Sequence, residues 1–212
     1  PWVKWAPPSN KGQRIANLKK HLTVLLSASI EDVQRECAQN DYTHVHFLAH
    51  GDSYKEAGQP RYGMALCNDR ERTRKVVVDG QRIAEALRAA DNIGQRRSRP
   101  QVVTLATCDS GNVRTVAAPG ASIAHDLHAF GIPWVIASQF PLTVPGSVRM
   151  AKKLYQGLFE GEDPRRLLHR LRSALHVSGH SDHDWASLVT YASVPEDPWR
   201  LDYDVGWFRS EQ

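Results

Sequence analysis

The sequence has little cysteine, no long apolar run and no signal-peptide pattern at its start. Its 212 residues include only three cysteines, Cys37, Cys67 and Cys108. This odd, sparse set argues against a disulfide scaffold and favours a reducing compartment. No apolar run approaches the roughly 18 residues that span a bilayer, so we expect a cytoplasmic protein with no membrane segment. Residues 1–5 contain no initiator Met, and we interpret the chain as an excised or processed piece of a longer polypeptide.

The chain also lacks a dominant charge. Its net charge is +4, and its 41% hydrophobic and 24% charged residues are typical of a globular protein rather than a disordered one. The positive charge gathers in three clusters, but Glu71 interrupts the first, and no aromatic residues alternate with the cations as a base-stacking platform requires. We interpret the clusters as solvated surface and expect no direct nucleic-acid binding. They are Arg70, Arg72, Arg74 and Lys75; Arg96, Arg97 and Arg99; and Arg165, Arg166, Arg170 and Arg172.

Apolar runs that alternate with amphipathic segments predict one α/β domain, with a mostly parallel central sheet and helices on both of its faces. Residues 1–19 are interpreted as a lead-in or linker and residues 20–212 as the domain. Ser29 is expected to cap a helix, and residues 51–63 to form a polar loop. The apolar face of helix 145–160 is assigned to Val148, Leu154, Tyr155, Leu158 and Phe159. Strands are predicted at 21–26, 44–50, 63–67, 75–78, 101–108 and 134–138, and helices at 30–39, 79–90, 121–130, 145–160 and from 164 onward.

Two of the predicted strands end in residues that carry chemistry. One runs over residues 44–51 and ends His50-Gly51, and the other runs over residues 101–111 and contains Cys108 near its end. Because active groups in open α/β sheets gather at the carboxyl ends of the strands, we expect the thiol and the imidazole to meet there. A neighbouring His supplies the base that a Cys needs to become a thiolate nucleophile. The sequence therefore predicts a Cys108–His50 dyad.

These residues resemble a known family. The segments HFLAHG (46–51) and LATCDSG (105–111) are similar to the caspase-like cysteine proteases, and within that group they most resemble the CHAT domain. WVIASQFP (134–141) resembles the strand that follows the nucleophile helix, and DWASLVTY (184–191) resembles the closing strand of that family. The resemblance implies a caspase-like three-layer sandwich and a cysteine endopeptidase activity. The Gln-Ala-Cys signature of the caspases themselves is absent.

The resemblance also implies how a substrate is held. It implies that the backbone N–H groups of Gly51 and Cys108 form the oxyanion hole. It further implies that the segment after the 134–138 strand pairs with the substrate as an added strand. Members that cut after Arg or Lys carry an Asp a few residues further on, whereas residues 140–145 contain no acid. We therefore expect a neutral P1 residue unless Asp109 enters the pocket. The substrate-binding candidates are Asp109, Ser138, Gln139, Phe140, Leu142 and Val144.

Three alternatives stay open at the level of sequence. The first is a catalytically silent module that uses the same sheet as a peptide-binding platform, with an ordinary rather than an activated Cys108. The second is nucleic-acid binding, which would show a steep salt dependence. The third is a metal site on His44, His46 and His50, which no Cys or acid at ligand spacing supports, so we expect no metal and no cofactor. For the protease, the resemblance implies a protein or peptide substrate and a regulatory sensor domain or partner, in bacterial defence or cell death.

Overall fold

The computed structural model describes residues 21–88, 100–106, 123–139, 142–159, 162, 164–177 and 184–193. Seven strands and six helices lie in this part of the chain. The helices are α2 (Ile30–Gln39), α3 (Gly80–Leu87), α4 (Ile123–Ala129), α5 (Val144–Phe159), α6 (Pro164–Val177) and α7 (Asp184–Ser187). The strands are β1 (His44–Leu48), β2 (His50–Glu56), β3 (Gln59–Cys67), β4 (Lys75–Val78), β5 (Val102–Ala106), β6 (Trp134–Ser138) and β7 (Leu188–Ala192).

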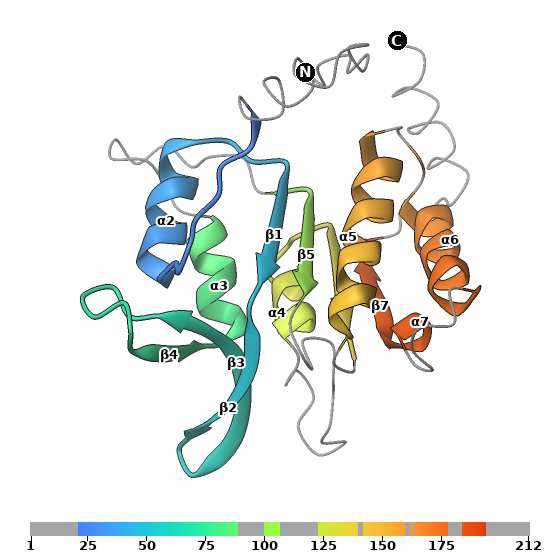
Figure 1. Cartoon of the computed structure of the whole chain (residues 1–212). Helices are drawn as coiled ribbons and strands as arrows, with labels where there is room; N and C mark the ends of the chain where they lie inside the picture. Colours follow the sequence, from blue (N-terminus) through green and yellow to red (C-terminus); the bar gives the residue numbers. More distant parts are fainter. Residues whose placement is uncertain are drawn as a thin grey trace.

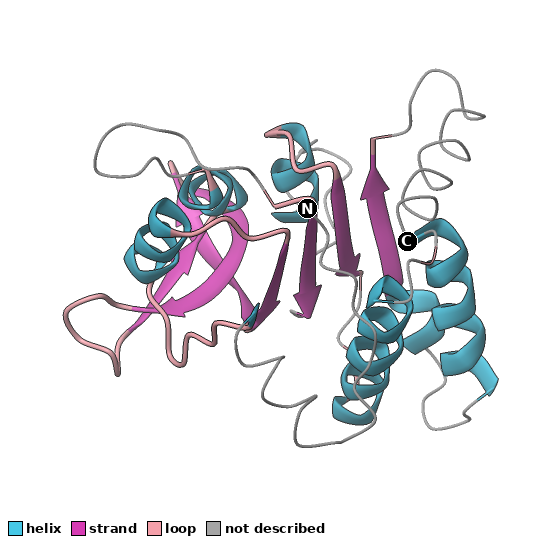
Figure 2. Ribbon diagram, turned by 90° about the horizontal axis from the view of Figure 1, so that it is seen from above, coloured by secondary structure: helices cyan, strands magenta, loops and turns pink. Residues whose placement is uncertain are grey.

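The described strands form two sheets. The main sheet has the order β1-β5-β6-β7, with β1, β5 and β6 parallel and β7 antiparallel to β6. The small sheet has the order β2-β3-β4 and is antiparallel throughout. Figures 1 and 2 show the small sheet at the carboxyl end of β1, with α2 and α3 packed beside it. The predicted α/β class with a mostly parallel central sheet is therefore confirmed. Among the described helices, none has the length and apolar character needed to cross a bilayer.

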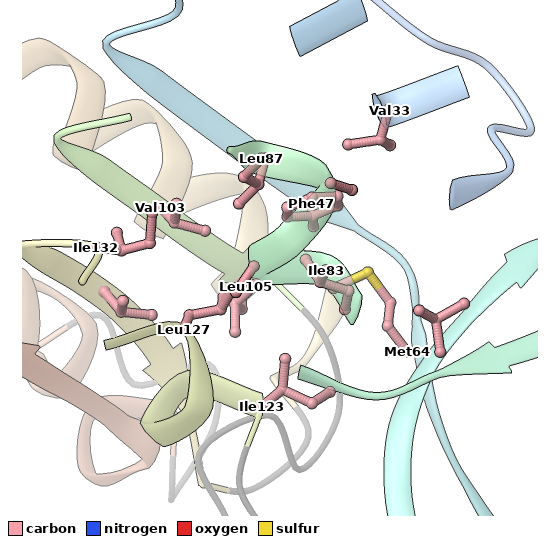
Figure 3. Close-up of a cluster of buried hydrophobic side chains, with 14 of the residues drawn as sticks. Val33, Phe47, Met64, Ile83, Leu87, Val103, Leu105, Ile123, Leu127 and Ile132 are labelled. Atoms are coloured by element: carbon pink, nitrogen blue, oxygen red, sulfur yellow. The ribbon is translucent and has the colours of Figure 1, made fainter. Parts of the chain in front are cut away.

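Two apolar cores lie on opposite faces of the main sheet. One face of the sheet, including Val103 and Leu105 of β5, packs with α2, α3 and α4. The other face, including Val102 and Ile136, packs against α5 and α6. Strands covered on both faces are expected to be apolar at nearly every position, as β5 and β6 are. Figure 3 shows part of the first core, to which β3 contributes Met64, so the small sheet is anchored in the same core as the main sheet.

The small sheet begins where the chain leaves the main sheet at Ala49. The polar loop predicted for residues 51–63 is wrong, because β2 and β3 form a hairpin there. Its turn has positive φ at Ala57 (48°) and Gly58 (80°), and two such residues in succession match the twist of a two-residue hairpin. The strand β2 was missed because its residues are mostly polar and it presents one face to solvent. The strands predicted at residues 63–67 and 75–78 are confirmed, and they pair with each other in antiparallel fashion.

A buried carboxylate joins α2 to the turn before β4. Ser29 caps α2 and exchanges hydrogen bonds with Asp32, which gives the predicted cap and a full capping box. Asp32 is buried and also forms an ion pair with Arg72, whose Nη2 lies 3.1 Å from Asp32 Oδ1. The hydrogen bond from Arg72 holds the pKa of Asp32 well below its usual range. Asp32 therefore positions Arg72 as well as the helix.

Two further expectations fail because apolar residues lie exposed. Residues 22–25 have no regular structure, and Leu22, Val24 and Leu26 are 62%, 64% and 86% exposed, so the strand predicted at 21–26 is wrong. An apolar run forms a strand only when another strand supplies hydrogen bonds, and among the described strands none pairs with it. Val148 is 62% exposed, so it does not belong to the apolar face of α5, whereas Leu154 of that face is buried.

We expect Asp32→Asn to lower the free energy of unfolding by about 2 kcal/mol at pH 7, a fall in Tm of roughly 4–8 °C. The folded-state pKa of Asp32 is depressed, so its stabilisation is complete above the unfolded-state pKa near 4 and is lost as pH falls below it. The difference in Tm from the wild type should thus shrink below about pH 4. Thermal melts between pH 2 and 8 measure it. Glu31→Gln, an exposed change on the same first turn, is the control, and an equal loss there would contradict the assignment.

Candidate active site

The register between β1 and β5 determines which residues share the carboxyl edge of the main sheet. The two strands are parallel, and their last paired residues are Leu48 and Ala106. His50 lies two positions after Leu48 in sequence, and Cys108 lies two positions after Ala106. Figure 1 shows the two arrowheads side by side. The described strands thus lead toward positions 50 and 108 from adjacent places on one edge, as the sequence predicted for these strand ends.

His50 and Gly51 begin β2 and lie at the junction of the two sheets. His50 pairs with Ala65 of β3, and Gly51 pairs with Met64. The His50 side chain is exposed, and among the residues that the structure describes, none hydrogen-bonds its imidazole. Both residues line an open depression of about 490 Å³ on the outer face of the small sheet. The imidazole is therefore accessible to a ligand bound in this depression.

Three of the predicted site residues, Cys108, Asp109 and Phe140, lie outside the described residues. The predicted dyad, the amide of Cys108 and the acid of Asp109 therefore stay predictions. Gly51 is half-buried, and its backbone continues directly from the carboxyl end of β1.

The remaining substrate-binding candidates follow β6. Ser138 is its last residue and is 1% exposed, so it can reach a substrate only through its backbone. The N–H of Gln139 donates to the carbonyl of Ser187 at 2.7 Å, which leaves its carbonyl and side chain for other partners. Leu142 is half-buried and packs against the α5–α6 core. Val144 is the first residue of α5. The structure brings Ser138 and Gln139 together against α7 and β7.

A buried carboxylate that sequence reasoning missed fixes the end of this segment. Asp184 of α7 is 3% exposed and accepts hydrogen bonds from Thr143 N (3.0 Å) and Thr143 Oγ1 (2.6 Å). Thr143 Oγ1 in turn accepts from Gly146 N at 3.1 Å and so caps α5. A Thr just before a helical pattern was the available signal for the cap. The partner 41 residues away carried no such signal.

The histidines of β1 are structural in the described part of the chain. His46 Nδ1 lies 2.8 Å from the hydroxyl of Tyr155, which joins β1 to α5. Burial lowers the pKa of His46 and raises the pKa of Tyr155 to about 12. Thr104 of β5, whose side chain partly offsets this rise in the pKa of Tyr155, is 1% exposed. Within the described residues no group of three His, Cys, Asp or Glu side chains is arranged to hold a metal ion.

A comparison of the sequence with protein-family models identifies the family to which the chain belongs. A family model of the CHAT domain matches residues 9–193. The chain belongs to the CHAT domain family. Its α/β sheet with helices on both faces is consistent with the caspase-like fold of that family, and the family context is that of caspase-like proteases. No curated protein matches the chain.

We expect iodoacetamide at near-neutral pH to label Cys108 of the activated CHAT protein faster than Cys37 or Cys67. Burial raises the pKa of Cys37 to about 11, so very little of this thiol is thiolate at near-neutral pH. Peptide mapping over time measures the three rates. The fast phase should disappear in Cys108→Ala. Cys67 as the fastest site would show that the nucleophile had been misassigned.

Proposed function

We propose that this CHAT domain is a cysteine endopeptidase with a Cys108–His50 dyad. The observation that supports this most strongly is the parallel register of β1 and β5, which ends at Leu48 and Ala106. Residues two positions beyond a paired set of strand ends are well placed to converge at the sheet edge. Membership of a family with a caspase-like protease context supports the same reading.

In the proposed mechanism, His50 accepts the thiol proton of Cys108, and the thiolate attacks the scissile carbonyl carbon. The carbonyl oxygen takes up the electron pair and is stabilised by the N–H groups of Gly51 and Cys108. His50 then donates its proton to the leaving amine as the C–N bond breaks, which yields an acyl-enzyme. A water molecule, deprotonated by His50, hydrolyses the thioester and restores the thiol. Each proton that His50 accepts is returned within the cycle.

A second candidate is a catalytically silent peptide-binding module. The observation in its favour is the His50 imidazole, which none of the described residues orients by a hydrogen bond. Catalytic histidines are normally held in one tautomer by a third group. The same observation fits an enzyme that completes its site only after activation, as expected if the domain is the effector part of a larger bacterial defence or cell-death protein in the cytoplasm. Incubation of the full-length parent with its candidate activators and a peptide library tests that context.

Cys108→Ala and His50→Ala are each expected to lower kcat by at least about a thousandfold. The kcat of the double variant should be no lower than that of the less active single variant, because the two residues act as one unit. Steady-state hydrolysis of a peptide substrate measures this, and circular dichroism checks the fold. His21→Ala, an exposed histidine away from the edge, and Cys37→Ala are the matched controls. Near-wild-type turnover in either dyad variant would refute the mechanism.

The P1 pocket is expected to prefer a neutral side chain over Arg or Lys. A buried guanidinium without a carboxylate partner costs several kcal/mol, and residues 140–145 contain no acid. Otherwise identical peptides with P1 Leu, Arg and Asp measure the preference as a ratio of kcat/KM. A strong preference for P1 Arg that disappears in Asp109→Asn would instead identify Asp109 as the pocket acid.

A further inference from the structure

The outer face of the small sheet is hollowed beside the proposed catalytic histidine. The depression of about 490 Å³ is lined by His50 and Gly51 of β2 and by residues 72–75 of the turn before β4 and its first residue. Pairing places His50 beside Ala65 on β3, and Ala65 beside Val77 on β4. The sheet is curved enough that the ammonium of Lys75 reaches across this face to the carboxylate of Asp52. A group bound in the hollow therefore lies next to the imidazole.

Of the cations that line the hollow, one has no counter-ion among the residues that the structure describes. Lys75 is paired with Asp52, and the hydrogen bond from Lys75 lowers the pKa of that carboxyl group. Arg72 forms ion pairs with the carboxylates of Asp32 and Asp69. Arg74 lines the same hollow, and among the described residues its guanidinium has no hydrogen bond or ion pair. Its backbone is fixed, because its N–H donates to the Glu71 carbonyl and its carbonyl accepts from the Asn68 N–H, both at 2.8 Å.

The order of the strands determines which half of a substrate passes over this hollow. Across the sheet the order is β6, β5, β1, and the small sheet continues from β1. If the residues after β6 bind the acyl half and the nucleophile follows β5, a peptide that continues in the same direction carries its leaving half over β1 and the small sheet. With strands about 4.8 Å apart and about 3.3 Å per extended residue, the hollow lies about two to four residues past the scissile bond.

We infer that Arg74 is a specificity-determining residue that binds an acidic side chain, Asp or Glu, on the leaving-group half of the peptide substrate. This inference rests on the proposed peptidase function and deepens it. A guanidinium pairs with a carboxylate through charge-assisted hydrogen bonds, and within the described part of the chain that of Arg74 has no such partner. The Asp52–Lys75 pair adds no net charge there, so the hollow is positive overall. The preference for a neutral P1 residue concerns the acyl side of the scissile bond. It is therefore independent of the preference for an acidic residue on the leaving-group side.

The test uses activated full-length protein and peptides that share one acyl half. The leaving half carries a single Glu at each of its first four positions in turn, with Gln at the same position as the matched peptide. We expect Glu at one of positions two to four to raise kcat/KM about tenfold over Gln. The advantage should weaken in high salt, because the site is open to solvent.

Two variants of Arg74 and one control decide the assignment. Arg74→Gln should bring the Glu-to-Gln ratio to about one. Arg74→Glu should make a Lys peptide better than the Glu peptide, which a misfolded variant cannot do. Arg70→Gln should keep the wild-type ratio, because Arg70 is an exposed cation on the same turn that does not line the hollow. A ratio near one in the wild type, an unchanged ratio in Arg74→Gln, or an equal loss in Arg70→Gln would overturn the inference.

Binding of the same peptides to Cys108→Ala, measured by fluorescence anisotropy, separates this inference from the proposed function. Cleavage without a preference for Glu overturns the inference and leaves the peptidase intact. Binding of Glu peptides that depends on Arg74, in a wild-type protein that cleaves none of them, supports the acidic site and overturns the peptidase. If the protein neither cleaves nor binds these peptides, both the inference and the proposed function are overturned.

Discussion

The parallel pairing of β1 with β5 is the constraint on which the rest of the structure depends. Five residues of each strand are paired, from His44 with Val102 to Leu48 with Ala106. A shift by one residue would turn the buried side chains of β5 away from their own core, since successive residues face opposite sides. The two apolar cores therefore lock the register, and the register in turn determines which residues follow the strands at the same edge. The same register of β1 and β5 therefore determines both how the cores pack and which strand ends lie side by side.

The chain then changes sheets within one residue. Ala49 is the only residue between β1, which is in the main sheet, and β2, which is in the small one. The small sheet is held to the first core through Met64, which is 0% exposed, and through Leu66 and Val78. The outer face of the same strands faces solvent and carries the hollow with its cations. The small sheet thus packs against the core on one face and presents a polar surface on the other. His50 lies where this sheet meets the main sheet.

The sequence was informative wherever burial leaves a simple pattern. The strands β5 and β6 were found because they are apolar on both faces, and α2 was found because Ser29 and Asp32 form a cap within four residues. The same pattern placed His50 just after β1 and predicted that Cys108 follows the neighbouring strand β5, whose described end pairs with that of β1. The hairpin β2–β3 was missed because its polar strand resembles a loop.

Long-range polar contacts were beyond the reach of sequence reasoning. The bonds from Thr143 to Asp184 and from His46 to Tyr155 join segments that only the fold brings together. The solvent-facing hollow depends in the same way on three strands and a turn. Local pattern therefore predicted the strands that lead to the candidate site, and tertiary packing determined what surrounds it.

The Asp184 carboxylate also constrains how this part of the protein can change during evolution. A Cβ at position 146 would collide with that carboxylate, so Gly146 and Asp184 fit together only as a pair. Replacement of Gly146 alone would push α7 away from the start of α5, and replacement of Asp184 alone would leave Thr143 N without its acceptor. Among related chains, these two positions should therefore covary, and a lineage that loses the acid becomes free to gain a side chain at 146.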